Sequence, residues 1–185
     1  NLENINLPNN LKKIESAAFY GCKKLKLIKM PDSLTEIGTH SFRGCISLNE
    51  VVFSSNINKI PYRAFSNCEA LREVSIPEGL VSIDDEAFYC AGLESVQLPD
   101  SLESIGESAF YMCKTLNRIN FPDSIEFIGE KAFYQCEQLT SVTLPKNLIS
   151  LEDDTFYNCI NIKTINLNNS LNKICARAFH GFSKI

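Results

Sequence analysis

The sequence predicts a repeat solenoid of the α/β class, in which short parallel strands and single helical turns alternate along one domain, residues 1–185. Three observations predict this fold: a phenylalanine recurs every 22 or 23 residues, apolar residues alternate over six positions and end at a proline, and several copies carry acidic residues ahead of the phenylalanine. Self-similarity at a period of roughly 20 to 50 residues is typical of repeat architectures, whose copies bury their apolar faces against one another.

The recurring phenylalanine sets the register of eight copies of the template L-x-x-I-x-x-x-A-F-x-x-C-x-x-L-x-x-I-x-L-P: Phe19, Phe42, Phe65, Phe88, Phe110, Phe133, Phe156 and Phe179. The fourth copy is one residue shorter between Phe88 and Leu93, after which its strand positions return to register. Because loops tolerate deletions better than strands do, we expect the missing residue to lie in a turn.

Each copy is expected to contain one strand and one helical turn. The stretch Leu71-x-x-Val74-x-Ile76 has the period of two that a strand needs, and Pro77 ends it because proline donates no ladder hydrogen bond. A strand of six residues cannot bury its apolar side alone, so the copies must stack strand beside parallel strand. The segment from Asp84 to Cys90 is predicted to form a helical turn on the opposite side, since acidic residues stabilise a helix N-terminus.

The blocks A-F-x-x-C and L-x-x-I-x-L-P make the chain resemble the BspA-type, or treponemal-type, leucine-rich repeat over essentially its whole length. The resemblance implies a leucine-rich-repeat arc of about eight coils, with a parallel sheet on the concave face and short helical turns plus extended segments on the convex side. Departures are few: Ser41 and Thr155 replace the alanine, Ser54 and Asn168 replace the proline, Phe182 replaces the last cysteine, and Pro61 stands where other copies have Gly, Glu or Asp.

Seven of the eight cysteines fall on the repeat position and predict a ladder of small buried thiols: Cys22, Cys45, Cys68, Cys90, Cys113, Cys136 and Cys159. Equivalent residues on successive coils keep parallel side chains, on the order of 5 Å apart, which is too far for a disulfide. A straight ladder also offers no tetrahedral metal site. Cys175 occupies a different slot, four residues before Phe179, and is either a neutral surface variant or a reactive thiol.

Composition and motifs indicate no enzyme, cofactor or metal. His40 and His180 are six repeats apart and cannot converge on one site, and no phosphate-binding glycine loop or zinc-binding histidine motif occurs. Acidic triplets such as Asp84–Glu86 suit a helical-turn N-terminus, although calcium binding is conceivable. Residues 78–154 carry 4 basic and 15 acidic side chains, which argues against nucleic acid. No apolar run is long enough to cross a membrane.

A solenoid without catalytic groups is expected to bind through a long surface, and in leucine-rich repeats this is the strand face. The hypothetical ligand-binding positions are the outward strand slots: Lys26, Leu27, Lys29, Asn49, Glu50, Val52, Arg72, Glu73, Ser75, Ser95, Gln97, Arg118 and Asn120. Leu27 and Val52 are apolar where equivalent slots are polar, so they form either a small contact for a partner chain or two scattered surface residues.

Two further surface features stand out. Phe127 replaces the lysine, glutamate or serine that other copies have in its slot. A row of tyrosines follows the recurring phenylalanine, and it either packs between coils or stacks on sugars or a partner: Tyr20, Tyr89, Tyr111, Tyr134 and Tyr157.

The resemblance implies a non-catalytic adhesion-type module of a cell-surface or secreted protein, which binds a protein of a host or neighbouring cell. A structural spacer and a carbohydrate-binding module are the alternatives. Asn1–Pro8 reads as the back half of a repeat and Ile185 lies midway through another, with no polar cap at either end. We therefore expect a fragment of a longer protein.

Overall fold

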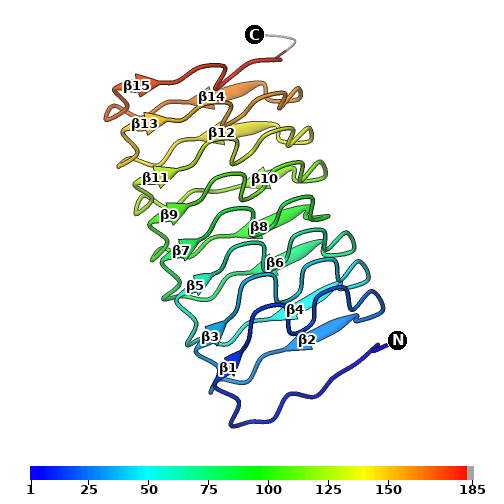
Figure 1. Ribbon diagram of the computed structural model, residues 1–185. Helices are drawn as coiled ribbons and strands as arrows, with labels where there is room; N and C mark the ends of the chain where they lie inside the picture. Colours follow the sequence, from blue (N-terminus) through cyan, green and yellow to red (C-terminus); the bar gives the residue numbers. More distant parts are fainter. Residues whose placement is uncertain (183–185) are drawn as a thin grey trace.

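The computed structural model describes residues 1–182 and shows coils that stack one on another into a gently twisted column (Figure 1). Each coil contributes one short strand to each of two columns of parallel strands. All strands pair with equivalents about one repeat away; Glu73 lies opposite Ser95, and Val74 opposite Val96. The parallel solenoid predicted from the repeat is therefore confirmed.

The fifteen strands fall into a first column of seven and a second column of eight. The first column consists of β2 (Leu27–Lys29), β4 (Glu50–Val52), β6 (Glu73–Ser75), β8 (Ser95–Gln97), β10 (Arg118–Ile119), β12 (Ser141–Thr143) and β14 (Thr164–Asn166). The second consists of β1 (Lys13–Ile14), β3 (Glu36–Ile37), β5 (Lys59–Ile60), β7 (Ser82–Ile83), β9 (Ser104–Ile105), β11 (Phe127–Ile128), β13 (Ser150–Leu151) and β15 (Lys173–Ile174).

Four strands of the first column, β2, β4, β6 and β12, alternate exposed, buried, exposed, as the period of two predicts. They are shorter than expected, because the six-residue pattern Leu71–Ile76 contains only the three-residue strand β6. Leu71 is buried at the turn before β6, and Ile76 is buried after it. The second column was not predicted as strands, since two residues are too few to show a period.

The predicted helical turns are wrong: residues 1–182 contain no helix. The residues two before and two after each phenylalanine have positive φ, as Arg63 (54°) and Asn67 (59°) do in the third copy. The amide of Phe65 donates to the Ala87 carbonyl of the next coil, at 2.8 Å, and the amide of Asn67 donates to Tyr89, at 2.7 Å. An α-helix needs consecutive right-handed residues and bonds within one segment. In this segment every second backbone amide instead donates a hydrogen bond to a carbonyl of the next coil.

The acidic residues ahead of the phenylalanine serve the same bonds between coils. The Asp85 carboxylate accepts a hydrogen bond from the Glu107 amide, at 2.7 Å, and Asp153 accepts one from the Ala176 amide, at 2.8 Å. These carboxylates accept hydrogen bonds from backbone amides of the following coil. The prediction that they lie at a helix N-terminus is therefore wrong.

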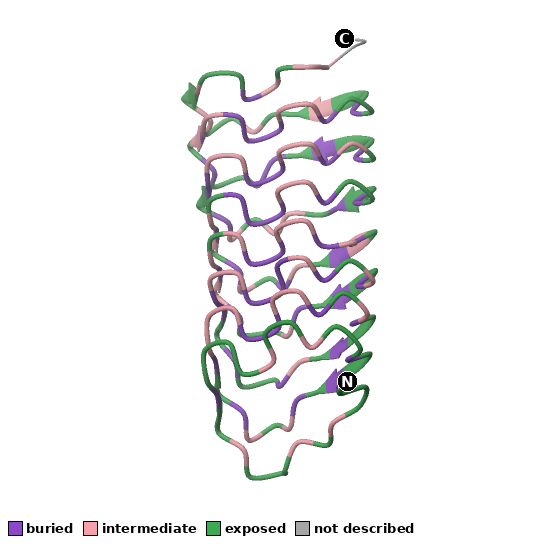
Figure 2. Cartoon of the chain, turned by 45° about the vertical axis from the view of Figure 1, so that its right-hand side comes forward, coloured by how far each residue is buried: buried purple, intermediate pink, exposed green. Residues whose placement is uncertain are grey.

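The core is a continuous apolar column enclosed by the two strand columns and the turn segments, and buried positions face inward in every coil (Figure 2). The eight recurring phenylalanines form one stack along its axis. Neighbouring rings are nearly parallel, with centroids 5.2 to 6.2 Å apart. Six of them are fully buried, and Phe19 and Phe179 are partly buried at the two ends.

The ladder of buried thiols has five members rather than the predicted seven, because Cys22 in the first coil and Cys90 are only half-buried. All eight cysteines are free, and Cys45, Cys68, Cys113, Cys136 and Cys159 are buried. Each of these five thiols donates to a phenylalanine carbonyl of the preceding coil, at 3.1 to 3.3 Å.

Cys90 does not take part in this ladder, contrary to the prediction. Ala91 fills the ladder position of the shortened coil: it is buried, and its amide bonds back to Phe88 as the ladder cysteines bond back to their phenylalanines. Cys90 instead takes the positive-φ position, at 54°, and is half-buried. The deletion does lie in the turn. It falls after Ala91, which holds the ladder position, and not before Cys90, as aligning the cysteines suggested.

Candidate functional site

The outward slots of the first strand column lie on one face, which we call the strand face. The structure leaves twelve of the thirteen predicted positions exposed, while Ser95 is half-buried: Lys26, Leu27, Lys29, Asn49, Glu50, Val52, Arg72, Glu73, Ser75, Gln97, Arg118 and Asn120. The inward partners in the same strands, such as Val51 and Val74, are buried. The strands thus position the predicted residues side by side.

The two apolar positions of the strand face lie diagonally across β2 and β4. Leu27 is opposite Glu50, and Lys29 is opposite Val52. Leu27 is 36% exposed and Val52 is 38% exposed. They share a face, but each has a charged residue as its direct neighbour in the paired strand.

The strand face is interrupted between β4 and β6. The first column consists of the pairs β2–β4 and β12–β14 and the three-stranded sheet β6–β8–β10, all within the described residues 1–182. Both interruptions follow a coil whose last core position is phenylalanine instead of leucine, isoleucine or methionine. The Phe53 ring meets Phe65 edge-on at 5.6 Å, and the Phe121 ring meets Phe133 in the same way at 5.4 Å. Each interruption of the first column therefore coincides with a larger ring at this core position.

Pro61 produces a matching interruption in the second column. In five other coils the residue after the short strand donates its amide to the preceding coil, as Asp84 does to Ile60 at 2.8 Å; Glu152 after β13 does not, and β13 is likewise not paired with β11. Proline has no amide hydrogen, and β5 does not pair with β3. The same two coils are therefore less tightly joined in both columns.

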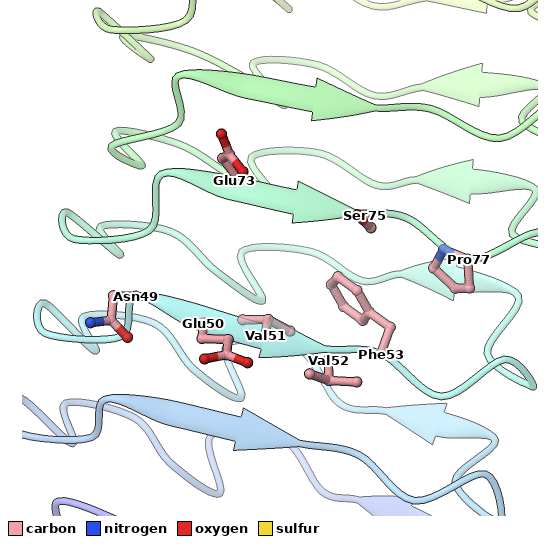
Figure 3. Close-up of a pocket in the computed structure, with 8 residues that line it drawn as sticks. All are labelled: Asn49, Glu50, Val51, Val52, Phe53, Glu73, Ser75 and Pro77. Carbon is pink, nitrogen blue, oxygen red and sulfur yellow. The ribbon is translucent and has the colours of Figure 1, made fainter.

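A hollow with a volume of about 690 Å³ lies in this gap on the strand face. It is lined by Asn49, Glu50, Val51, Val52, Phe53, Glu73, Ser75 and Pro77. Figure 3 shows Phe53 projecting from the end of β4 toward Ser75 and Pro77 on the next coil. Apolar groups therefore occupy one end of the hollow, and Glu50 and Glu73 occupy the other.

Two of the four basic side chains of the strand face are already paired. Lys26 lies 3.3 Å from Glu3, and Arg72 lies 3.6 Å from Glu94 while donating to the Gly92 carbonyl at 2.8 Å. Lys29 makes none of the ion pairs found in residues 1–182. The two carboxylates thus set the charge of the hollow itself.

Four of the five tyrosines of the predicted row form a stack on the outer side, while Tyr20 stands apart from it with Arg43 5.7 Å from its ring centroid. Tyr89, Tyr111, Tyr134 and Tyr157 lie 4.7 to 4.8 Å apart with parallel rings, and His180 continues the row. Each inner ring has a neighbour on both faces, so only its edge and hydroxyl remain for contacts. This geometry favours packing between coils over the stacking of a sugar on a ring face. Burial raises the pKa of Tyr89 and of Tyr111.

The two remaining predicted surface residues lie on the second column. Phe127 belongs to β11 and is 48% exposed. Cys175 follows β15 and is half-buried, with its sulfur 3.6 Å from a Glu152 carboxylate oxygen. The structure brings neither residue to the hollow on the strand face.

No catalytic or metal-binding group emerges within residues 1–182. His40 packs against Tyr62 and His180 against Tyr157, in different coils, and no three metal-ligating side chains cluster. Burial lowers the pKa of His40, with Arg43 and Arg63 acting in the same direction. None of the described residues forms a helix that could span a membrane.

Sequence reasoning identified five residues of the hollow but missed Val51, Phe53 and Pro77. Two signals could have pointed to it. Phe53 and Ser54 both depart from the Leu-Pro end of the template in one coil, and Pro61 departs in the next segment. Neither departure predicts a hollow by itself, because the hollow also depends on how the Phe53 ring packs on Phe65.

Several solved structures resemble this chain. TpLRR, a leucine-rich repeat protein of T. pallidum, is 27% identical with a TM-score of 0.69, and the match covers 97% of this chain and 76% of that one. A leucine rich cell surface protein of Faecalibacterium prausnitzii is 26% identical with a TM-score of 0.68, covering 91% and 58%. A leucine-rich repeat protein of Eubacterium ventriosum is 31% identical with a TM-score of 0.69, covering 73% and 37%.

No curated protein matches the chain. The family model of the BspA type leucine rich repeat region (6 copies) matches residues 1–117 and 81–185, which together span the whole sequence. With the repeat, the parallel coils and this match in agreement, the chain belongs to the BspA-type leucine-rich repeat family.

Proposed function

We propose that this chain is a non-catalytic recognition module of a cell-surface or secreted protein, which binds a partner protein through the strand face. The observation that carries the proposal is the hollow between β4 and β6, where Val52 and Phe53 offer apolar surface beside two carboxylates. Interfaces concentrate their binding energy in a few buried apolar anchors surrounded by polar groups. We expect the partner to insert an apolar side chain and to place a cationic group near Glu50 and Glu73.

The surroundings of the hollow support a protein partner. Leu27 and Val52 extend the apolar surface onto β2, and Lys29 and Arg72 flank it. One similar structure is that of a leucine rich cell surface protein, which supports a surface location for this chain as well. The alternatives, a structural spacer and a carbohydrate-binding module, predict different outcomes in the same experiment.

The test uses the isolated chain as bait on surface proteins of host or neighbouring cells and on a glycan array, followed by affinity measurement with variants. The double variant Leu27→Ser/Val52→Ser should weaken binding of an identified protein by about tenfold or more, the size expected for loss of an interface anchor. Its melting temperature should not change, since both side chains are exposed and Ser75 and Ser141 already occupy equivalent strand positions.

Two further variants sharpen the test. Ile46→Ser/Ile160→Ser removes two exposed apolar side chains outside the strand columns and should leave affinity unchanged. Phe53→Leu introduces the residue found at the equivalent positions Leu98 and Leu144. It should weaken binding by closing the hollow. Equal affinity of all variants would contradict the proposal, binding only to glycans would favour the carbohydrate module, and no ligand at all would favour the spacer.

A further inference from the structure

A second feature lies on the second strand column, away from the strand face. Phe127 is the only aromatic residue among the outward positions of this column, whose other members are lysine, glutamate or serine. Its backbone pairs with Ser104, and 48% of the residue is exposed. Within residues 1–182 its ring packs against no other aromatic ring, unlike Phe53 and Phe121. An exposed ring above a serine leaves one face open.

Small residues next to Phe127 form the floor of a trough. The trough has a volume of about 430 Å³ and is lined by Tyr62, Ile83, Asp84, Asp85, Ser104, Gly106 and Phe127. Gly106 keeps the floor low, because a Cβ atom there would lie 2.4 Å from Asp85 Oδ1 and 2.6 Å from its backbone nitrogen. Tyr62 and Phe127, which come from coils on either side, close the two ends.

Two carboxylates form the wall of the trough, and none of its lining residues is basic. Asp84 accepts a hydrogen bond from Ser82 at 3.0 Å and lies 3.4 Å from Lys59. Asp85 accepts a hydrogen bond from the Glu107 amide at 2.7 Å, so its position is fixed by the next coil. Six of its seven lining residues lie in the segment 78–154, where 15 acidic side chains oppose 4 basic ones; the seventh, Tyr62, lies beside Arg63, which is paired with Glu86. The local field therefore favours a cation.

We propose that this trough binds an arginine side chain of a partner protein. The guanidinium would lie over the Phe127 ring and donate to the carboxylates of Asp84 and Asp85. Arginine fits better than lysine because its planar group both stacks on aromatic faces and donates to carboxylates in a fork. The molecule itself shows this stacking: the Arg63 guanidinium lies 5.0 Å from the Tyr62 ring centroid, and that of Arg43 lies 5.7 Å from Tyr20.

The test is titration of the chain with a fluorescein-labelled peptide, acetyl-Gly-Arg-Gly-Arg-Gly-amide, and with peptides carrying lysine or citrulline in place of arginine. The arginine peptide should bind most tightly, the citrulline peptide about tenfold or more weakly, and 0.5 M salt should weaken the arginine peptide. Phe127→Ser should reduce affinity by about three- to tenfold, as expected for a lost cation–π contact. This variant should fold, because Ser82, Ser104 and Ser150 occupy the equivalent positions.

Asp85→Asn gives an independent measure, since an amide oxygen can still accept from the Glu107 amide while the charge is removed. It should also weaken the arginine peptide, whereas Asp100→Asn, an exposed charge in a turn of the same solenoid, should not. Leu27→Ser/Val52→Ser should leave the peptide bound, which separates this site from the strand face. Unchanged affinity in Phe127→Ser and Asp85→Asn, or equal affinity for the citrulline peptide, would overturn the proposal.

Discussion

Single residues that depart from the repeat account for the features that distinguish one coil from the next. Pro61 removes one amide that would join β5 to β3, and Phe53 places a ring where the following strand would approach. Ala91 interrupts the thiol ladder. At each of these positions the neighbouring coils carry the usual residue of the repeat. Comparing the coils therefore separates the effect of one side chain from that of the fold.

The ladder thiols are expected to be unreactive in the folded protein. Burial raises the pKa of Cys45 and of Cys159 from 9.0 to about 12, and it raises the pKa of Cys68 and Cys136 well above the ordinary value. At pH 8 a thiol of pKa 12 is ionised in only about one molecule in ten thousand, and the thiolate is the reactive form. Because folding raises these pKa values, the ladder contributes full stability below pH 9 and loses it as the pH rises toward 12.

Thiol counting with a chromogenic disulfide reagent at pH 8 should therefore give three reactive groups in the native protein and eight in denaturant. The three are the half-buried cysteines Cys22, Cys90 and Cys175, where the sequence alone suggested one; Cys90 should react most slowly, because burial raises its pKa. Ala91→Cys supplies a control, because the added thiol would enter the ladder and raise only the denatured count. Rapid reaction of more than three native groups would contradict the buried ladder.

Stacking between elements, rather than any single strand, holds the coils together. Strands of two or three residues are too short to be stable alone, and each coil adds a phenylalanine ring, a leucine and an isoleucine to the core column. Phe110 is fully buried between Phe88 at 5.4 Å and Phe133 at 5.2 Å, whereas Phe179 is partly buried, with Phe156 stacked at 6.2 Å and Phe182 tilted against it at 5.8 Å. The cost of losing a ring should thus depend on its place in the stack.

Phe110→Leu is expected to lower the free energy of unfolding by about 2 to 3 kcal/mol, since it leaves a cavity and removes two ring contacts. Phe179→Leu should cost about 1 kcal/mol, because that ring is only partly buried and has one stacked neighbour, Phe156, at the longest spacing of the stack. Urea unfolding followed by circular dichroism measures both values. Equal costs at the two positions would mean that the stack contributes nothing beyond local packing.

At the scale of the whole molecule, the sequence predicted the solenoid because aligning the repeated copies shows which residues are equivalent from coil to coil. Eight aligned phenylalanines fixed the coil, and the alternation around Val74 placed the strand face correctly. The sequence could not show that the turn segment is not helical, because positive φ at residues such as Arg63 and Glu86 follows from bonds to the next coil and not from residue type. It also could not place Cys90, since a deletion can be aligned in two ways until packing decides.

The candidate site shows the same division between what repeats and what does not. The outward positions of the strand face follow from the period of two, and the structure exposes nearly all of them. The hollow depends on contacts between coils, namely Phe53 on Phe65 and the missing amide of Pro61. Such contacts join residues of different coils. The residue pattern of a single repeat copy therefore does not predict them.

The interruptions at β4–β6 and β10–β12 predict how the column opens. In a solenoid each coil contacts only its neighbours, so stability depends on the interfaces between coils. The central block holds the four-stranded sheet β5–β7–β9–β11 and the three-stranded sheet β6–β8–β10, whereas the outer blocks hold only pairs of strands. Native-state hydrogen exchange should give the highest opening free energies for amides of β7 to β10, with a step of about 1 kcal/mol or more at each interruption, where several net hydrogen bonds are missing. Phe53→Leu should make the first step smaller, because only the interruption at Pro61 then remains there, and it should leave the second step unchanged. A smooth decline from the centre to both ends, without steps, would mean that the gaps do not weaken the column.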